Sequence, residues 1–169
     1  MDEVKKWDEI FDYDHDTGEL RWKVKPCDKV RCGDIAGSKS NKGYLQVGYK
    51  GKQYRAHRIV YEMVHGSIPV GMQIDHKNRV KDDNRLENLR LATNLENSRN
   101  GSMSSNNTSG STGVFWDKGT GKWRASLCLS GKHFHLGIFT HKPDAIDARL
   151  AAEKLYYGAF APSLVKGFA

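Results

Sequence analysis

One segment of the chain, residues 70–100, carries the residue types that hydrolyse a phosphodiester bond. Asp75 and His76 stand side by side near its start, and Asn88 and Asn97 follow. Such hydrolysis needs a group that takes a proton from water, and positive charge where the phosphate and the leaving oxygen become more negative. His76 suits the first task because an unperturbed imidazole titrates near neutral pH. Asp75 and Asn97 offer hard oxygen ligands for an ion such as Mg²⁺.

A strand, a loop, a second strand and a helix are expected to position these side chains. An apolar strand over residues 72–74 ends at the Asp-His pair, and residues 89–92 form the second strand. Thr93 and Glu96 have the T-x-x-E spacing of a capping box, which predicts that a helix begins there. Successive strand residues point to opposite sides, so one side chain of the pair can hold metal while the other approaches water.

This pattern of residues resembles the HNH family, which is also called the His-Me finger or ββα-metal nucleases. The resemblance is to its phage and intron homing-endonuclease branch. The matching text is Asp75-His76, then Asn88-Leu89-Arg90, then Asn97, with A-H-R-I-V upstream over residues 56–60. The resemblance implies that His76 is the general base and that Asn88 holds the loop and the base in place. It implies that Asp75 and Asn97 bind Mg²⁺ or Mn²⁺. Asn97 replaces the last histidine of the family name, as also happens within the homing branch.

Upstream of this segment the sequence predicts a DNA-binding hairpin. The formal charge is +7 and the pI about 9.3, which favours a polyanionic partner and salt-sensitive binding. Residues 35–61 contain no acidic residue, and they read as two strands followed by a short helix over residues 57–65. Basic side chains on such a hairpin can follow a phosphate backbone, with a solvated face as the alternative. The DNA contacts expected in this half are Lys50, Lys52, Arg55, Arg58 and Arg90.

Before the hairpin, apolar spacing predicts a helix over residues 4–11.

A polar stretch divides the chain. Residues 100–111, N-G-S-M-S-S-N-N-T-S-G-S, are too poor in apolar side chains to form a core. They are expected to be a flexible linker between an HNH nuclease domain with its basic hairpin, residues 1–99, and a DNA-binding domain, residues 112–169.

The C-terminal part predicts a three-stranded sheet backed by one helix. Strands are expected over residues 113–117 and 122–129, with the apolar side chains of the second strand on one face. A turn at Ser130-Gly131 leads to a third strand, on which His133, His135 and Gly137 are expected to share a face. The helix over residues 143–157 then ends at Gly158. Its predicted packing stripe consists of Ala148, Ala151, Ala152, Leu155 and Tyr156.

The sheet face away from this helix is expected to bind DNA. Its donors are Lys122, Arg124, Ser126, His133 and His135. The order G-V, W, G-K-W-R-A, H-L-G-I-F and an alanine-rich helix resembles the plant ethylene-response-factor, or apetala-type, DNA-binding domain. That resemblance implies a core of Trp123, Leu136, Gly137 and Phe139. Several arginines of the plant sheet are replaced, so the plant target sequence does not carry over. A small protein-interaction domain is the alternative.

The expected fold class is therefore α+β: a ββα-metal HNH catalytic module plus a three-stranded antiparallel sheet packed on one helix. The expected function is site-selective, divalent-metal-dependent cleavage of double-stranded DNA to 5′-phosphate and 3′-hydroxyl ends, by a protein that is a monomer on DNA. Two alternatives stand beside it: a DNA-binding regulator that has lost catalysis, and a non-specific nuclease. The first predicts loss of at least one of the four motif residues, and the second needs no separate binding domain.

Cysteine usage and hydropathy bear on the compartment. Cys27 and Cys32 have a C-x4-C spacing that suits half a zinc site, but no second close pair follows, so these two and Cys128 are expected to be free thiols. No window approaches the roughly 20 apolar residues of a membrane span, and the acidic N-terminal segment does not resemble a signal peptide. The expected location is the cytoplasm of a bacterial or phage-infected cell, with no membrane contact.

Overall fold

The computed structural model describes residues 6–101 and 103–161. The chain divides into two compact units, Met1–Asn94 and Leu95–Ala169. The division falls at the start of a helix, a few residues before the predicted boundary at 99/100. Within the described ranges no helix combines the length and the hydrophobicity that a membrane span requires. All three cysteines are described, and all are free thiols as predicted.

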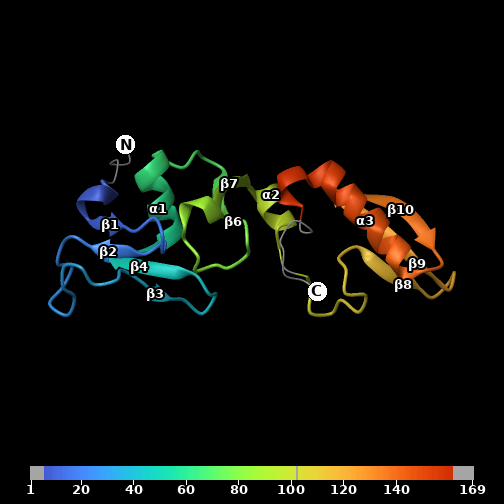
Figure 1. Ribbon diagram of the computed structural model, residues 1–169, viewed down its shortest axis with the longest axis horizontal. Helices are drawn as coiled ribbons and strands as arrows, with labels where there is room; N and C mark the ends of the chain where they lie inside the picture. The colour runs from blue at the N-terminus through green and yellow to red at the C-terminus, as the bar shows by residue number, and fades with distance from the viewer. Residues whose placement is uncertain (1–5, 102, 162–169) are drawn as a thin grey trace. The chain divides into compact units, whose positions relative to one another are not determined.

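The first unit is built from small antiparallel sheets packed around helix α1 (Figure 1). Strand β1 pairs with β2, β4 lies between β3 and β5, and β6 pairs with β7. Its elements are, in chain order, the 3-10 helix η1 (Trp7–Glu9), β1 (Phe11–Tyr13), β2 (Leu20–Trp22), β3 (Ser38–Lys39), β4 (Leu45–Tyr49), β5 (Lys52–Arg55), α1 (Ala56–His65), β6 (Met72–His76), the 3-10 helix η2 (Leu86–Asn88), β7 (Leu89–Thr93) and the start of α2 (Asn94–Arg99).

Most of the predicted elements of this unit are confirmed. The basic hairpin is β4 and β5, joined by a two-residue turn in which Lys50 and Gly51 both have positive φ. The expected helix over residues 4–11 is wrong for its described part, because only η1 is helical and Phe11 begins β1. Phe11 pairs with Trp22 across the β1–β2 hairpin and is fully buried, so tertiary packing overrides the helical spacing.

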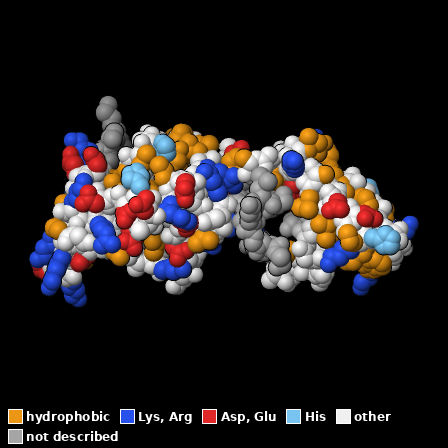
Figure 2. Space-filling view, viewed as in Figure 1, with side chains coloured by type: hydrophobic (Ala, Val, Ile, Leu, Met, Phe, Trp, Pro, Cys, Tyr) orange, Lys and Arg blue, Asp and Glu red, His pale blue; other side chains and the backbone are white. Residues whose placement is uncertain are grey.

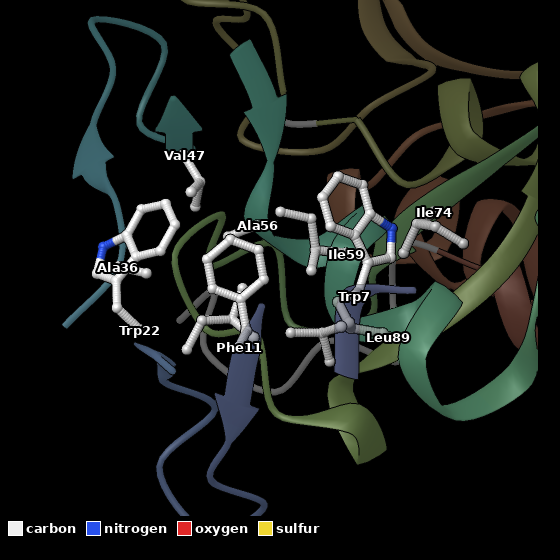
Figure 3. Packing of buried hydrophobic residues seen from close by; sticks show 11 residues of the cluster. Trp7, Phe11, Trp22, Ala36, Val47, Ala56, Ile59, Ile74 and Leu89 are labelled. Carbon is white, nitrogen blue, oxygen red and sulfur yellow. The ribbon is translucent and has the colours of Figure 1, made fainter. Parts of the chain in front are cut away.

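The core of the first unit reaches the strands of the predicted catalytic segment. Figure 3 shows Ile74 of β6 and Leu89 of β7 among the buried aromatic and aliphatic side chains of the upstream elements, including Trp7 and Ile59. A two-stranded sheet is marginally stable by itself. The N-terminal hairpins and α1 therefore supply the apolar surface on which β6 and β7 are fixed.

The second unit is a three-stranded antiparallel sheet packed on one long helix, as predicted. Its elements after α2 are β8 (Val114–Asp117), β9 (Lys122–Leu129), β10 (Lys132–Phe139), α3 (Lys142–Tyr157) and the 3-10 helix η3 (Gly158–Phe160). The alternation of β9 is confirmed, since Ala125 and Leu127 are buried against α3. In β10 a bulge between His135 and Gly137 shifts the register. Gly137 then pairs with Ala125, so it leaves the face shared by His133 and His135, and the predicted alternation is wrong beyond the bulge.

The predicted packing stripe of α3 is confirmed at Ala152 but wrong at three of its five positions. The buried positions are Ala145, Arg149, Ala152, Glu153 and Tyr157, whereas Ala151, Leu155 and Tyr156 are exposed. Arg149 donates to Glu153 at 2.9 Å and to the backbone oxygen of Ser126 at 2.6 Å. A charged pair thus occupies the packing face, because each charge is compensated there. Apolar periodicity alone does not detect such a stripe.

Two leucine substitutions test this phase. Leu127→Ala removes a side chain that is 1% exposed and is expected to lower the free energy of unfolding by about 2–5 kcal/mol. Leu155→Ala, at a position that is 74% exposed, is expected to change it by less than about 0.5 kcal/mol. Urea unfolding of both variants measures the difference. A large loss in Leu155→Ala would restore the stripe that the sequence predicts.

Candidate active site

Strand β6 carries the two central side chains of the site. Asp75 and His76 are 6% and 4% exposed. Asp75 pairs across the sheet with Arg90, and His76 pairs with Leu89. Since successive residues of a strand alternate, His76 lies on the face that Ile74 and Leu89 place against the core. Asp75 and Arg90 share the other face.

Asp75 forms an ion pair with Arg90 on the neighbouring strand. The Nε and Nη2 atoms of Arg90 both lie 2.8 Å from Oδ2 of Asp75, and both side chains are largely buried. Removing one partner of such a pair leaves an uncompensated buried charge. Arg90 therefore orients the carboxylate, and a DNA contact from Arg90 stays a prediction.

His76 lies in a pocket of aromatic and amide groups. Its Nε2 is 3.2 Å from Oδ1 of Asn84. The His57 ring meets it edge-on at 4.9 Å between centroids, and the Tyr44 ring lies 5.9 Å away. Burial lowers the pKa of His76 below its usual value, against the raising effects of the Asn84 hydrogen bond and the Asp75 charge. A neutral imidazole at physiological pH is the form that can accept a proton.

The loop between β6 and β7 is held at both ends by Asn88. Its Oδ1 accepts the backbone N–H of Asn78 at 2.9 Å, and its Nδ2 donates to the backbone oxygen of Asp83 at 2.8 Å. The Arg85 side chain makes two hydrogen bonds to the Asp83 carboxylate and holds the pKa of that carboxyl at about 2. The Asn88 side chain thus acts on the backbone of the loop.

Tyr13, from the distant strand β1, also anchors this loop. Its hydroxyl donates to the backbone oxygen of Asn84 at 3.2 Å and accepts the backbone N–H of Leu86 at 2.9 Å. Lys39 of β3 adds an ion pair to Asp82 at 2.7 Å. Sequence reasoning missed Tyr13, Asn84 and the packing role of Tyr44. The polar tripeptide Asp83-Asn84-Arg85, shortly before Asn88, is a local feature that could have indicated Asn84. No local feature of the sequence indicates Tyr13.

The basic residues of the hairpin fall into two groups. Arg55, at the end of β5, stacks on Tyr44 with its guanidinium carbon 4.6 Å from the ring centroid, so it lies beside the histidines. Lys50 and Lys52 are exposed at the opposite end of the hairpin, and Arg58 is exposed on α1. On the face seen in Figure 2, basic and acidic side chains are interspersed over the first unit rather than forming one basic track.

His57 lies in the first turn of α1 and packs against the hairpin. It is buried, its ring contacts Tyr44 at 5.4 Å, and its Nδ1 has no hydrogen-bond partner among the described residues. Burial lowers the pKa of His57 to about 3, and the nearby charge of His76 acts in the same direction. A neutral, buried imidazole of this kind is a packing group.

Asn97 belongs to α2, which begins directly after β7 as the capping-box spacing predicts. Gln73 of β6 donates to Oδ1 of Asn94, the first residue of that helix, at 3.3 Å. Asn97 itself is half-buried and lies in the second compact unit, past the division at Asn94. Its assignment as a ligand therefore stays a prediction.

The donor set suits a hard divalent cation. Asp75 supplies carboxylate oxygens, and Mg²⁺ is commonly held by one or two carboxylates together with substrate phosphates. One carboxylate fits an ion whose remaining ligands are a bound phosphate, an amide oxygen and water. Among the described residues no group of three His, Cys, Asp or Glu side chains gathers as a metal cluster.

In the second unit the predicted DNA-contacting residues share one sheet face. Arg124 pairs with Phe115 on β8 and with Ile138 on β10, and Ser126 and Cys128 pair with His135 and His133. Lys122 lies two residues before Arg124 on the same face. Phe115, Cys128 and Ile138 share this face with Lys122 and Arg124, so the face is mixed in character.

Comparisons with known proteins support the expected HNH assignment of the catalytic segment. Residues 54–99 match a family model described as HNH endonuclease. Protein 3.8 of Escherichia phage T7 is 41% identical over 81 residues, which cover 48% of this chain and 67% of that protein. An uncharacterised HNH endonuclease of Acanthamoeba polyphaga mimivirus is 32% identical over 126 residues, or 70% and 62% of the two chains.

A solved structure gives a partial likeness. The HNH homing endonuclease I-HmuI, in a structure of DNA binding and cleavage, is 24% identical, with a TM-score of 0.42 over 58% of this chain and 55% of that one. The chain thus spans less than two thirds of the mimivirus protein and of the solved chain.

The buried state of His57 predicts a pH dependence of stability. In the folded protein the pKa of His57 is about 3, below the ordinary 6.5. At a pH between these two values, His57 is protonated in the unfolded chain and neutral in the folded one. The stabilising contribution is present above pH 6.5 and is lost as the pH falls. From pH 7 to pH 5 the wild type is expected to lose about 2 kcal/mol more than His57→Gln. Urea unfolding at both pH values measures this, and equal losses would contradict it.

Proposed function

The chain belongs to the HNH endonuclease family, and we propose that it is a site-selective, divalent-metal-dependent endonuclease of the homing kind that cleaves double-stranded DNA. The observation that carries the proposal is the pair at the end of β6. Asp75, oriented by Arg90, and His76, neutral and buried, are adjacent on one strand and face opposite ways.

His76 is the general base of the proposed reaction. Its neutral ring takes a proton from a water molecule as the water oxygen attacks the phosphorus atom. The bond from phosphorus to the 3′ oxygen breaks, and the leaving oxygen takes a proton from solvent. The products are a 5′-phosphate and a 3′-hydroxyl end. A positioned base of this kind contributes about 10²–10⁴-fold to such a rate.

Asp75 and Asn97 are the residues proposed to hold Mg²⁺ or Mn²⁺. The chemistry that the ion supplies when bound is neutralisation of the phosphate charge and stabilisation of the departing oxygen. Arg90 keeps the Asp75 carboxylate in one orientation. Asn88 keeps the ends of the β6–β7 loop together, which preserves the distance between base and substrate.

The remaining basic and polar groups are proposed to bind the duplex. In the first unit these are Lys50, Lys52, Arg55 and Arg58, of which Arg55 is nearest to the histidines. In the second unit the open sheet face, with Lys122, Arg124, Ser126, His133 and His135, is proposed to supply affinity and register in the manner of an apetala-type domain. The support for this is the shared face of these side chains and the helix that backs the opposite face.

A plasmid assay tests the proposal. Supercoiled DNA incubated with the protein and Mg²⁺ is expected to be nicked or linearised, and a chelator is expected to abolish this. His76→Ala is expected to lower the rate by at least about 10²-fold, because it removes the base. His65→Ala is the matched control, since His65 is an exposed histidine at the end of α1, and its rate is expected to equal that of the wild type.

The outcomes separate the alternatives. Tight binding without cleavage by the wild type would contradict the proposal and favour a DNA-binding regulator. Metal-dependent cleavage at scattered positions would support nuclease activity but contradict site selectivity. Cleavage that survives in His76→Ala would contradict the assignment of the base.

A further inference from the structure

We infer that Phe115 and Ile138 are specificity residues that recognise the 5-methyl group of thymine in the major groove, beside a guanine that Arg124 reads. Such recognition rests on the DNA binding proposed above for the second unit, and it defines the base chemistry that this unit selects. The three side chains form one cross-strand triplet. Arg124 of β9 pairs with Phe115 of β8 on one side and with Ile138 of β10 on the other.

The triplet lies on the sheet face that is turned away from α3. Ala125, the residue after Arg124, is fully buried, and it packs in one hydrophobic cluster with Val114 of β8 and Ala145 of α3. Successive residues of a strand point to opposite faces of the sheet. Arg124 and its two cross-strand partners therefore point away from the helix.

Two large apolar side chains are exposed on this face. Phe115 is 44% exposed and Ile138 is 40% exposed. The side chain between them is charged, so the triplet is not a continuous apolar patch of the kind that marks a protein interface. Apolar and cationic groups in alternation match the major groove, where thymine methyl groups lie next to the hydrogen-bond acceptors of the bases. The triplet thus favours DNA over an apolar protein partner.

Arg124 has donors available for a base. Its side chain is 41% exposed, and its Nη1 lies 3.9 Å from Oδ2 of Asp117, which is longer than a hydrogen bond. Among the residues that the structure describes, its Nε has no hydrogen-bond partner. Asp117 is itself held in its turn, because its Oδ1 accepts the backbone N–H of Gly119 at 2.9 Å. Asp117 therefore orients the guanidinium and leaves it able to donate to O6 and N7 of guanine.

The size of the triplet fits the groove. Neighbouring strands lie about 4.8 Å apart, so three strands span about 10 Å, and the major groove of B-DNA is about 12 Å wide. Bases of one strand follow at about 3.4 Å, which puts each apolar side chain about one to two base pairs from the guanine. Lys122 lies two residues before Arg124 on the same face and is in place for a backbone phosphate.

Replacement of thymine by uracil tests the inference, because the two bases differ only in the 5-methyl group and pair alike with adenine. The full-length protein, with Ca²⁺ in place of the working ion, is used to select duplexes from a random-sequence pool. The selected duplex is then made once with thymine and once with uracil. Burial of one methyl group is worth about fourfold in the dissociation constant, so the wild type is expected to bind the thymine form about four- to sixteenfold more tightly.

Four variants assign the effect to the triplet. Phe115→Ser and Ile138→Ser are each expected to lower the ratio of the two dissociation constants by at least about twofold, because the contact with a methyl group is lost. Leu155→Ala is the matched control, an exposed apolar position on α3, and it is expected to keep the wild-type ratio. Lys122→Ser is expected to weaken both forms by the same factor, since a phosphate contact does not distinguish bases. Circular dichroism checks that each variant is folded.

The outcomes separate this recognition from the proposed function. A wild type that binds both forms equally would overturn the inference and leave the nuclease proposal standing. So would a ratio that is unchanged in both serine variants, or a selected site in which no thymine lies within about two positions of a guanine. Absence of DNA binding by the wild type would overturn the proposed function, and the inference with it.

Discussion

The two-residue period of strand β6 is the constraint on which the site depends. Ile74 enters the hydrophobic core of the first unit, so His76, two residues later, is directed to the same side. Asp75 is directed to the opposite side, where Arg90 meets it. A shift of one residue in this register would place the carboxylate against the core and the imidazole at the surface. The packing of Ile74 and Leu89 against Trp7 and α1 therefore sets the chemistry as well as the stability.

Burial gives the two side chains different electrostatic settings. His76 is surrounded by rings and an amide, which favour the neutral imidazole. Asp75 forms an ion pair with the Arg90 guanidinium at 2.8 Å. A base and an oxygen ligand can thus coexist on neighbouring residues. The β6–β7 loop, anchored by Asn88 and Tyr13, keeps this arrangement from depending on the loop's own weak local structure.

The sequence predicted the local elements of the site well, because they follow from short-range chemistry. The strands expected over residues 72–74 and 89–92 are found as β6 and β7, and the helix after Thr93 and the basic hairpin are also found in the structure. The capping-box spacing is a local signal that needs no tertiary information. The α+β class and the three-stranded sheet on one helix follow from the same kind of pattern.

The misses arise where distant contacts decide. The stripe of α3 is out of phase because Arg149 and Glu153 compensate each other inside, and β10 changes face because of a bulge that no letter marks. Tyr13 reaches the loop from 71 positions away in the chain. Asn97 and the DNA-contacting residues stay predictions from the sequence.

A crystal structure of the full chain with a DNA duplex and Ca²⁺ in place of the working ion tests the central claim most directly. The account predicts an ion at the Asp75 carboxylate in contact with a DNA phosphate, and the His76 imidazole directed at that phosphate from the other side of the strand. A duplex bound with its phosphates far from both side chains, or an ion coordinated elsewhere, would contradict it.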